Sequence, residues 1–211
     1  IEPDIRLVLL LGNQDAETTA IPMIMVSSDP RSPQLGSHCL VEARHLPAQM
    51  GAIDRWHANR IAAGVPEGSV DLTPERALML EAGLDRLGAV DFEKGCYVGQ
   101  EVTARTHYRG LVKRRLVPLT IAGDPPAIDS DIMWQGTAIG KSKTAAALNV
   151  PITGTHGRMD AKSICLALLK LSDLHNILDA PANDDGLMIN GHAARLALAD
   201  WMQPLPRQGK S

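Results

Sequence analysis

The residues best suited to chemistry lie in one octapeptide, residues 94–101, which reads Lys-Gly-Cys-Tyr-Val-Gly-Gln-Glu. Gly95 and Gly99 lie on either side of a single thiol, that of Cys96, and leave its backbone open to a ligand. Lys94 lies two residues before this thiol, and we expect a helix to begin just after it. A nearby cation and a helix N-terminus both favour a thiolate, so the pattern predicts a reactive Cys96. The alternative is a packed structural cysteine in a glycine-rich turn.

A cluster of basic residues overlaps the octapeptide and continues beyond it. Between residues 94 and 115, only Glu101 opposes the basic residues Lys94, Arg105, Arg109, Lys113, Arg114 and Arg115. In a chain with a formal net charge of -3, this cluster is a local positive patch that suits an acidic ligand or partner. The alternative is a solvated strand edge, because Lys and Arg protect exposed edges. We expect such an edge at residues 113–115 and leave both interpretations open for Arg105 and Arg109.

Length and composition limit the class of protein. A chain of 211 residues with 45% hydrophobic residues can form one large or two small domains with a true core. Its net charge, and its aromatic content of 3%, predict no nucleic-acid partner and no membrane partner. The three cysteines, Cys39, Cys96 and Cys165, form no CxxC pair and lie at no zinc-ligand spacing from a histidine. We therefore expect no metal site and a reducing compartment, either the cytoplasm or, in a eukaryote, the mitochondrial matrix.

The first half of the sequence alternates between strands and helices. Apolar runs predict strands at residues 6–11, 22–26 and 38–44. Helical spacing predicts a helix over residues 49–63, and a second, short helix is expected from Gln100 to His107. Thr73 followed by Pro74 predicts the start of another helix, since these residues favour the N-cap and the first helical position. The chain opens with a strand-like run after Ile1 and without a leader, so we expect it to be the C-terminal part of a longer protein.

After Gly110 the pattern changes to short strands joined by tight turns. Period-two alternation predicts a strand over residues 113–121, and residues 163–171 form a further strand candidate, with helix as the alternative. Gln135-Gly136 and Asn190-Gly191 predict turns between short strands, and the second pair is a strong hairpin signal. A small antiparallel β-barrel is the architecture that these strands favour. The expected organisation is α+β, with one domain over residues 1–110 and a barrel domain over 111–211, and a long loop over 145–161.

The octapeptide resembles the signature Lys-Gly-Cys-Phe/Tyr-x-Gly-Gln-Glu of the YgfZ-type folate-binding proteins, with every fixed position intact. The resemblance extends to residues 6–12, 80–84 and 102–109, and is weakest over 141–162, where an insertion is expected. These proteins are relatives of the T-protein, the aminomethyltransferase (GcvT) of glycine cleavage, and take part in iron–sulfur cluster assembly or repair. The resemblance implies a ferredoxin-like α/β segment of the folate-binding fold, followed by the C-terminal barrel.

The resemblance also assigns a cofactor and its site. In the T-protein branch, a Glu in the segment that matches residues 80–83 binds the pterin ring, and a carboxylate suits the 2-amino group and ring N–H of a pterin. Glu81 occupies that position here, and its alternative role is a surface acid beside Arg76 or Arg86. The cofactor implied is tetrahydrofolate or a one-carbon derivative, with Cys96 near its channel. The residues expected to bind it are Glu81, Lys94, Gly95, Tyr97, Gly99, Gln100, Glu101, Arg105 and Arg109.

The resemblance implies three alternative functions. The first is a tetrahydrofolate-binding factor for iron–sulfur cluster assembly or repair, with client or assembly proteins as partners. The second is a folate-dependent aminomethyltransferase that moves a one-carbon unit to tetrahydrofolate. The third is a non-enzymatic module that binds folate or a partner protein. The T-protein branch has no cysteine in the segment that matches the octapeptide, so Cys96 counts against the second function. Whether the protein turns over a substrate is left open.

Overall fold

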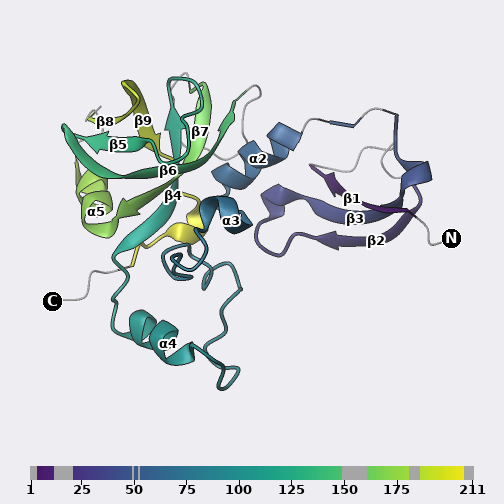
Figure 1. Ribbon diagram of the computed structural model, residues 1–211, viewed down its shortest axis with the longest axis horizontal. Helices are drawn as coiled ribbons and strands as arrows, with labels where there is room; N and C mark the ends of the chain where they lie inside the picture. The colour runs from purple at the N-terminus through teal and green to yellow at the C-terminus, as the bar shows by residue number, and fades with distance from the viewer. Residues whose placement is uncertain are drawn as a thin grey trace.

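The computed structural model describes residues 4–11, 21–48, 50–51, 53–148, 161–180 and 186–206. The strands form a closed barrel and a three-stranded sheet. Figure 1 shows these two parts and an excursion that carries the helix α4. Helices α2 (Ile53–Ala62) and α3 (Gly68–Asp71) lie between the sheet and the barrel. No helix in the described part of the chain is long and apolar enough to cross a membrane.

The three-stranded sheet confirms the strands predicted in the first third of the chain. Its antiparallel strands are β1 (Ile5–Leu10), β2 (Met23–Ser28) and β3 (Ser37–Glu42), in the order β1-β3-β2. Val8, Cys39 and Val41 are buried on one face, whereas Leu7 and Met25 remain 61% and 52% exposed. The described residues thus show a three-stranded sheet, and the ferredoxin-like arrangement remains a prediction.

The barrel predicted for the second half of the chain is confirmed. Six antiparallel strands close in the order β4-β7-β6-β5-β8-β9. Their bounds are β4 (Arg114–Ile121), β5 (Asp131–Trp134), β6 (Thr137–Ala147), β7 (Ser163–Lys170), β8 (Leu187–Ile189) and β9 (His192–Leu196). The interior is apolar, with Leu119, Ile132 and Cys165 fully buried. Helix α5 (Leu171–Asp179), which the sequence pattern did not predict, packs on this core through Leu171 and Leu174.

Both predicted turns join barrel strands in the expected way. Gln135 and Gly136 have φ of 48° and 80°, and Asn190 and Gly191 have φ of 48° and 79°. Two consecutive residues with positive φ match the twist of the flanking strands in a two-residue hairpin. The predicted loop over residues 145–161 begins later than expected, because β6 continues to Ala147. Residues 149–160 of that loop lie outside the described residues.

The helix predicted to start at Thr73 is wrong. Helix α3 ends at Asp71, and residues 74–76 and 79–88 form turns instead of a helix. Glu75 and Gly83 have φ of 62° and 76°, which interrupts any right-handed helix of L-residues. The favourable N-cap pair was therefore overridden by the residues that follow it.

Helix α2 confirms the helical spacing predicted between residues 49 and 63. Its buried face packs against the outside of the barrel, where the apolar contacts are Ala58, Ile61, Ala62, Leu116, Ala146, Ile164 and Leu166. The chain then runs along the outer barrel surface through residues 71–88, which contribute the buried residues Leu80 and Leu87 to the neighbouring apolar clusters. Helix α2 and residues 71–88 are thus attached to the barrel by apolar contacts.

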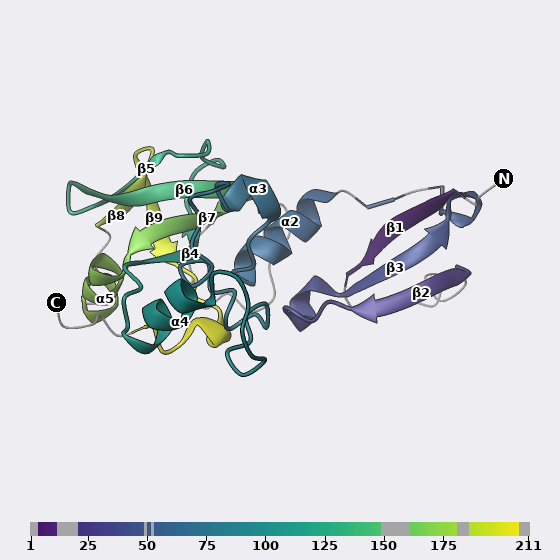
Figure 2. The same ribbon diagram turned by 60° about the horizontal axis from the view of Figure 1, so that its bottom comes forward.

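Helix α4 (Gln100–Tyr108) lies apart from the other helices, on an excursion between residues 71–88 and β4 (Figures 1 and 2). None of its residues is buried. We call residues 92–110 the α4 segment. It carries the whole octapeptide on the surface of the molecule.

Candidate functional site

The octapeptide forms an open turn before α4. Gly95 and Gly99 have φ of 89° and 87°, in the left-handed region that glycine adopts without strain. A Cβ atom placed on either glycine would meet no heavy atom within 4 Å. Cys96, between them, is exposed. The alternative of a packed structural cysteine is therefore wrong, and the enhanced reactivity of this thiol stays a prediction.

The contacts that hold the octapeptide are local. The Lys94 ammonium lies 5.1 Å from the centre of the Tyr97 ring, within cation–π range. The Tyr97 N–H donates to the Gln100 side-chain oxygen at 3.1 Å, and the Gln100 N–H donates to the Tyr97 carbonyl at 3.1 Å. Val98 is fully exposed, at 101%. These bonds fix the turn that presents Cys96 ahead of α4, and they leave the thiol accessible.

An aromatic cluster closes the base of the α4 segment. Phe92 stacks on His107 with ring centres 4.2 Å apart, and Tyr108 contacts both rings edge-on at 5.9 Å and 5.1 Å. Phe92 also packs against the barrel core. The cluster therefore joins the two ends of the excursion to each other and to the barrel.

Glu81 lies in a different environment from the octapeptide. It is only 6% exposed, and Arg114 binds both of its carboxylate oxygens, with Nε and Nη2 each 3.1 Å from an oxygen. Its carbonyl accepts a hydrogen bond from the Leu116 N–H at 2.9 Å. The alternative of a surface acid beside Arg76 or Arg86 is wrong. Arg86 instead donates to two backbone carbonyls near the end of the described chain.

A cavity of about 550 Å³ lies between residues 71–82 and the outer face of the barrel, and Glu81 lines it. The charged residues around it are Asp71, Arg76, Glu81, Arg114, Asp129, Asp131, Lys141, Lys143 and Lys170. Among the residues that the structure describes, no aromatic residue and no residue of the octapeptide lines it, and neither do Arg105 and Arg109. The structure thus places Glu81 in this cavity and Cys96 outside it.

The solvated strand edge predicted at residues 113–115 is confirmed for Lys113 and Arg114, which are exposed, and wrong for Arg115, which is buried. In the described part of the chain, strand β4 pairs with β7 along its whole length but with β9 only over residues 119–121, so its first residues have a neighbouring strand on one side. Arg114 reaches the cavity, whereas Arg115 is 1% exposed and donates from Nη1 to the Leu80 carbonyl at 2.7 Å. Burial lowers the Arg115 pKa to about 10, against the raising effect of Asp85 at 3.9 Å. Arg115 therefore holds the turn that carries Glu81 onto the barrel.

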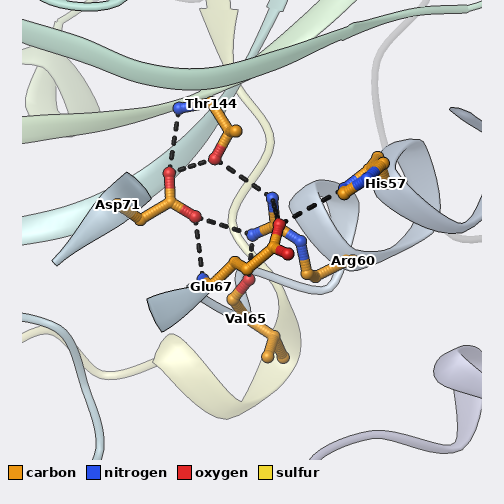
Figure 3. Close-up of polar contacts among 6 residues, drawn as sticks. All are labelled: His57, Arg60, Val65, Glu67, Asp71 and Thr144. Atoms are coloured by element: carbon orange, nitrogen blue, oxygen red, sulfur yellow. Dashed lines mark hydrogen bonds and ion pairs between the residues drawn. The ribbon is translucent and has the colours of Figure 1, made fainter. Parts of the chain in front are cut away.

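A buried ionic network lies next to the cavity. Figure 3 shows its members, which are His57, Arg60, Val65, Glu67, Asp71 and Thr144. Arg60, with no exposed surface, donates to Asp71 at 2.7 Å and to Thr144 at 3.0 Å. Asp71 in turn accepts a hydrogen bond from the Thr144 N–H at 2.9 Å. The network ties α2 and α3 to β6, and no motif in the sequence signalled it.

The three cysteines differ sharply in environment. Cys39 and Cys165 are buried, and burial raises the pKa of both thiols, that of Cys165 to about 12. The neighbouring Asp71 charge raises the Cys165 pKa further. Of the three thiols, Cys96 is the one exposed to solvent. Within the described ranges, no group of three or more His, Cys, Asp and Glu residues is arranged to hold a metal ion.

Comparison with known proteins gives a consistent result. One relative is the mitochondrial iron–sulfur cluster assembly factor IBA57 homolog of Mycosarcoma maydis, to which the chain is 43% identical over 121 residues. This match covers 53% of this chain and 30% of the relative. It is 41% identical over 107 residues to the mitochondrial IBA57 of Mus musculus, which covers 49% of this chain and 30% of the relative. With the IBA57 homolog of Chaetomium globosum the identity is 34% over 161 residues, or 72% of this chain and 37% of the relative.

No family model matches the chain. The chain spans less than two fifths of the length of each of these three relatives. All three relatives are named as iron–sulfur cluster assembly factors of the IBA57 type.

Proposed function

We propose that this chain acts in iron–sulfur cluster assembly, as part of a protein that binds tetrahydrofolate and presents the Cys96 thiol. The observation that carries the proposal is its similarity to IBA57 proteins, which reaches 43% identity. The octapeptide agrees with it, because it resembles the signature of a folate-binding branch linked to the same process. The names of the relatives place them in mitochondria, and we expect that compartment here if the source is eukaryotic.

The proposed role of the octapeptide follows from its exposure. A thiol at the surface, held by local bonds and preceded by a lysine, is accessible to a client protein or to a cluster in transfer. The two glycines on either side leave room for a partner backbone to approach. Arg105 and Arg109, both exposed, extend this surface for an acidic partner or for the part of a folate outside the cavity.

The proposed pterin site is Glu81. Each oxygen of an ionised carboxylate accepts more than one hydrogen bond, so Glu81 can keep Arg114 and still accept from a pterin. The cavity volume of about 550 Å³ lies within the usual range of about 300–1,000 Å³ for small-molecule sites. The lining residues therefore fit the hydrogen-bonding edge of a pterin, and they supply no aromatic ring to stack on its face.

The role in cluster assembly is tested by complementation of a strain that lacks its own IBA57-type protein. The Cys96→Ser variant should fail to restore the activities of iron–sulfur enzymes, while the wild type restores them. Val98→Ser is the matched control, because it alters an exposed side chain of the same turn. Full restoration by Cys96→Ser would remove the thiol from the proposal.

The pterin assignment is tested by calorimetric titration of tetrahydrofolate into the protein. Glu81→Gln should weaken binding by about tenfold or more, since it removes a charge-assisted pair of hydrogen bonds. Glu93→Gln, at an exposed position of the α4 segment, is the control and should bind as the wild type does. Equal affinities for the wild type and Glu81→Gln would show that the pterin binds elsewhere.

A further inference from the structure

The charges around the cavity are unevenly neutralised. Three lining cations have a carboxylate partner: Lys143 with Asp129 at 2.8 Å, Lys141 with Asp131 at 2.8 Å, and Arg114 with Glu81 at 3.1 Å. The remaining lining acid, Asp71, belongs to the Arg60 network.

Two lining cations, Arg76 and Lys170, have no ion pair or side-chain hydrogen bond with any described residue. In a chain with a formal net charge of -3, the cavity thus carries a local excess of positive charge.

The strand register brings two of the cavity's cations together. Arg114 on β4 is directly opposite Lys170 on β7, and both side chains line the cavity. Like charges directly opposite each other on paired strands destabilise the pair. The Glu81 carboxylate is paired with Arg114, and none of the ion pairs of the described residues includes Lys170. A second negative group at this position would relieve the repulsion.

Arg114 retains donors for such a group. Its Nε and Nη2 atoms point to the Glu81 oxygens, and its side chain is 48% exposed. A guanidinium has five N–H donors, so donors remain for a ligand even while the Glu81 pair persists. An incoming anion can therefore bind Arg114 and Lys170 together without breaking a buried ion pair.

We propose that the cavity binds a small ligand that carries carboxylate or phosphate groups, held by Lys170, Arg114 and Arg76. Each of these residues lines the cavity, and two of them lack a competing acid among the described residues. The site goes beyond the pterin assignment, because neither Lys170 nor Arg76 takes part in it.

The probes that test the site are citrate and inorganic pyrophosphate, titrated by calorimetry at low salt so that charge screening stays weak. At least one probe should bind saturably at a single site. Lys170→Gln and Arg76→Gln should each weaken that binding about fivefold, because an exposed ion pair contributes up to about 1 kcal/mol. Tighter binding of citrate would identify a carboxylate ligand, and tighter binding of pyrophosphate a phosphate ligand.

The matched control is Lys113→Gln, which removes an exposed cation one residue before Arg114 and outside the cavity. Its affinity should equal that of the wild type. All these positions are exposed, so the variants should fold, which circular dichroism checks. Absence of saturable binding, or an equal loss in Lys113→Gln, would overturn the proposal.

A fourth variant separates this site from the pterin assignment. Glu81→Gln leaves Arg114 without its acid, so it should tighten the binding of the anionic probe while it weakens tetrahydrofolate. If the protein binds the anionic probe but not tetrahydrofolate, the anion site is supported and the pterin assignment is wrong. Weaker anion binding in Glu81→Gln would contradict the charge argument made for Arg114.

Discussion

The α4 segment and residues 71–88 contrast in almost every physical respect. The α4 segment carries the octapeptide, has no buried residue in its helix, and is held by local bonds and one aromatic cluster. Residues 71–88 lie against the barrel and contain a buried Asp71 and a buried Glu81, each bound to an arginine. The strongest sequence signal therefore lies in a segment whose helix has no buried residue.

This contrast separates two ways in which a residue can matter. A side chain such as Cys96 can be changed at little structural cost, so any requirement for a thiol at this position comes from what it contacts beyond the described residues. A side chain such as Glu81 belongs to an ion pair that also supports the fold, so structural and binding roles overlap there. Experiments on stability and on accessibility distinguish the two cases.

The largest difference is expected in thiol accessibility. Cys96 should react rapidly with a disulfide reagent in the folded protein. Cys39 and Cys165 should react at least about a thousandfold more slowly, because exposing a core thiol requires an opening that costs several kcal/mol. Labelling followed by mass spectrometry should find one modified thiol in the native protein and three in denaturant. Two rapidly labelled thiols would mean that the barrel or the sheet opens easily.

The next largest effect is expected in the buried network. Asp71→Ala leaves the buried Arg60 guanidinium with the half-exposed Glu67 carboxylate, at 3.3 Å, in place of its buried partner, which should lower the free energy of unfolding by about 3 kcal/mol. Urea unfolding measures this change. Asp54→Ala, on the exposed side of α2, is the control and should have little effect.

The double variant Arg60→Met with Asp71→Leu should recover much of the loss, because it removes both charges together. If the free energy of unfolding of Asp71→Ala lies within about 1 kcal/mol of the wild-type value, the other partners of Arg60 are sufficient to hold it. The residues of the network then do not act together.

Substitutions at two glycines, one in each region, allow a direct comparison of the two regions. An added Cβ at Gly83, where φ is 76°, would lie 2.8 Å from Arg115 Nη2 and from the Trp201 ring. Gly99 has a similar φ of 87° and open space around it. Gly83→Ala should therefore cost about 2–4 kcal/mol, from strain and overpacking, and Gly99→Ala about 1 kcal/mol, from strain alone. Thermal unfolding measures both, and equal losses would show that crowding at Gly83 relaxes without cost.

Local signals predicted much of the barrel and the first sheet. The positive φ of Asn190 and Gly191 follows from their residue types, and the strand at residues 163–170 from its apolar run. The helix expected from Thr73 failed because Glu75 adopts a positive φ that no local signal indicated. The solvated position expected for Arg115 was wrong because its side chain is buried and binds the Leu80 carbonyl, which lies 35 positions away in the sequence.

The candidate site was predictable only where it depends on a continuous motif. The octapeptide is contiguous, so its turn and the helix after it could be inferred from glycine positions and spacing. The Glu81–Arg114 pair joins residues 33 positions apart, and the Arg60 pair with Thr144 joins residues 84 positions apart. Such pairs depend on the packing of α2 and residues 71–88 on the barrel, which no single segment specifies.

The alkaline stability of the protein should reflect Cys165. Burial raises its pKa to about 12 from the ordinary value of 9.0, so the folded protein keeps a proton that the unfolded chain loses above pH 9. The stabilisation is complete below that pH and is lost as the pH rises toward 12, by about 2–3 kcal/mol between pH 9 and pH 11. Cys165→Ala should flatten this part of the profile, and Cys96→Ala should leave it unchanged. Identical slopes for all three proteins would assign the alkaline loss to other groups.

The smallest effect is expected at Val98, the most exposed apolar side chain of the octapeptide. Val98→Ser removes no packed contact, so the melting temperature should change by less than about 2 °C. Differential scanning calorimetry measures this shift, with Val117→Ser in the barrel core as the destabilised reference. A fall as large as that of the reference would mean that the turn packs against another surface in solution. In that case the exposure of Cys96 would no longer support a role in contacting a partner. The α4 segment would then be packed, as residues 71–88 are, and the contrast between the two regions would be lost.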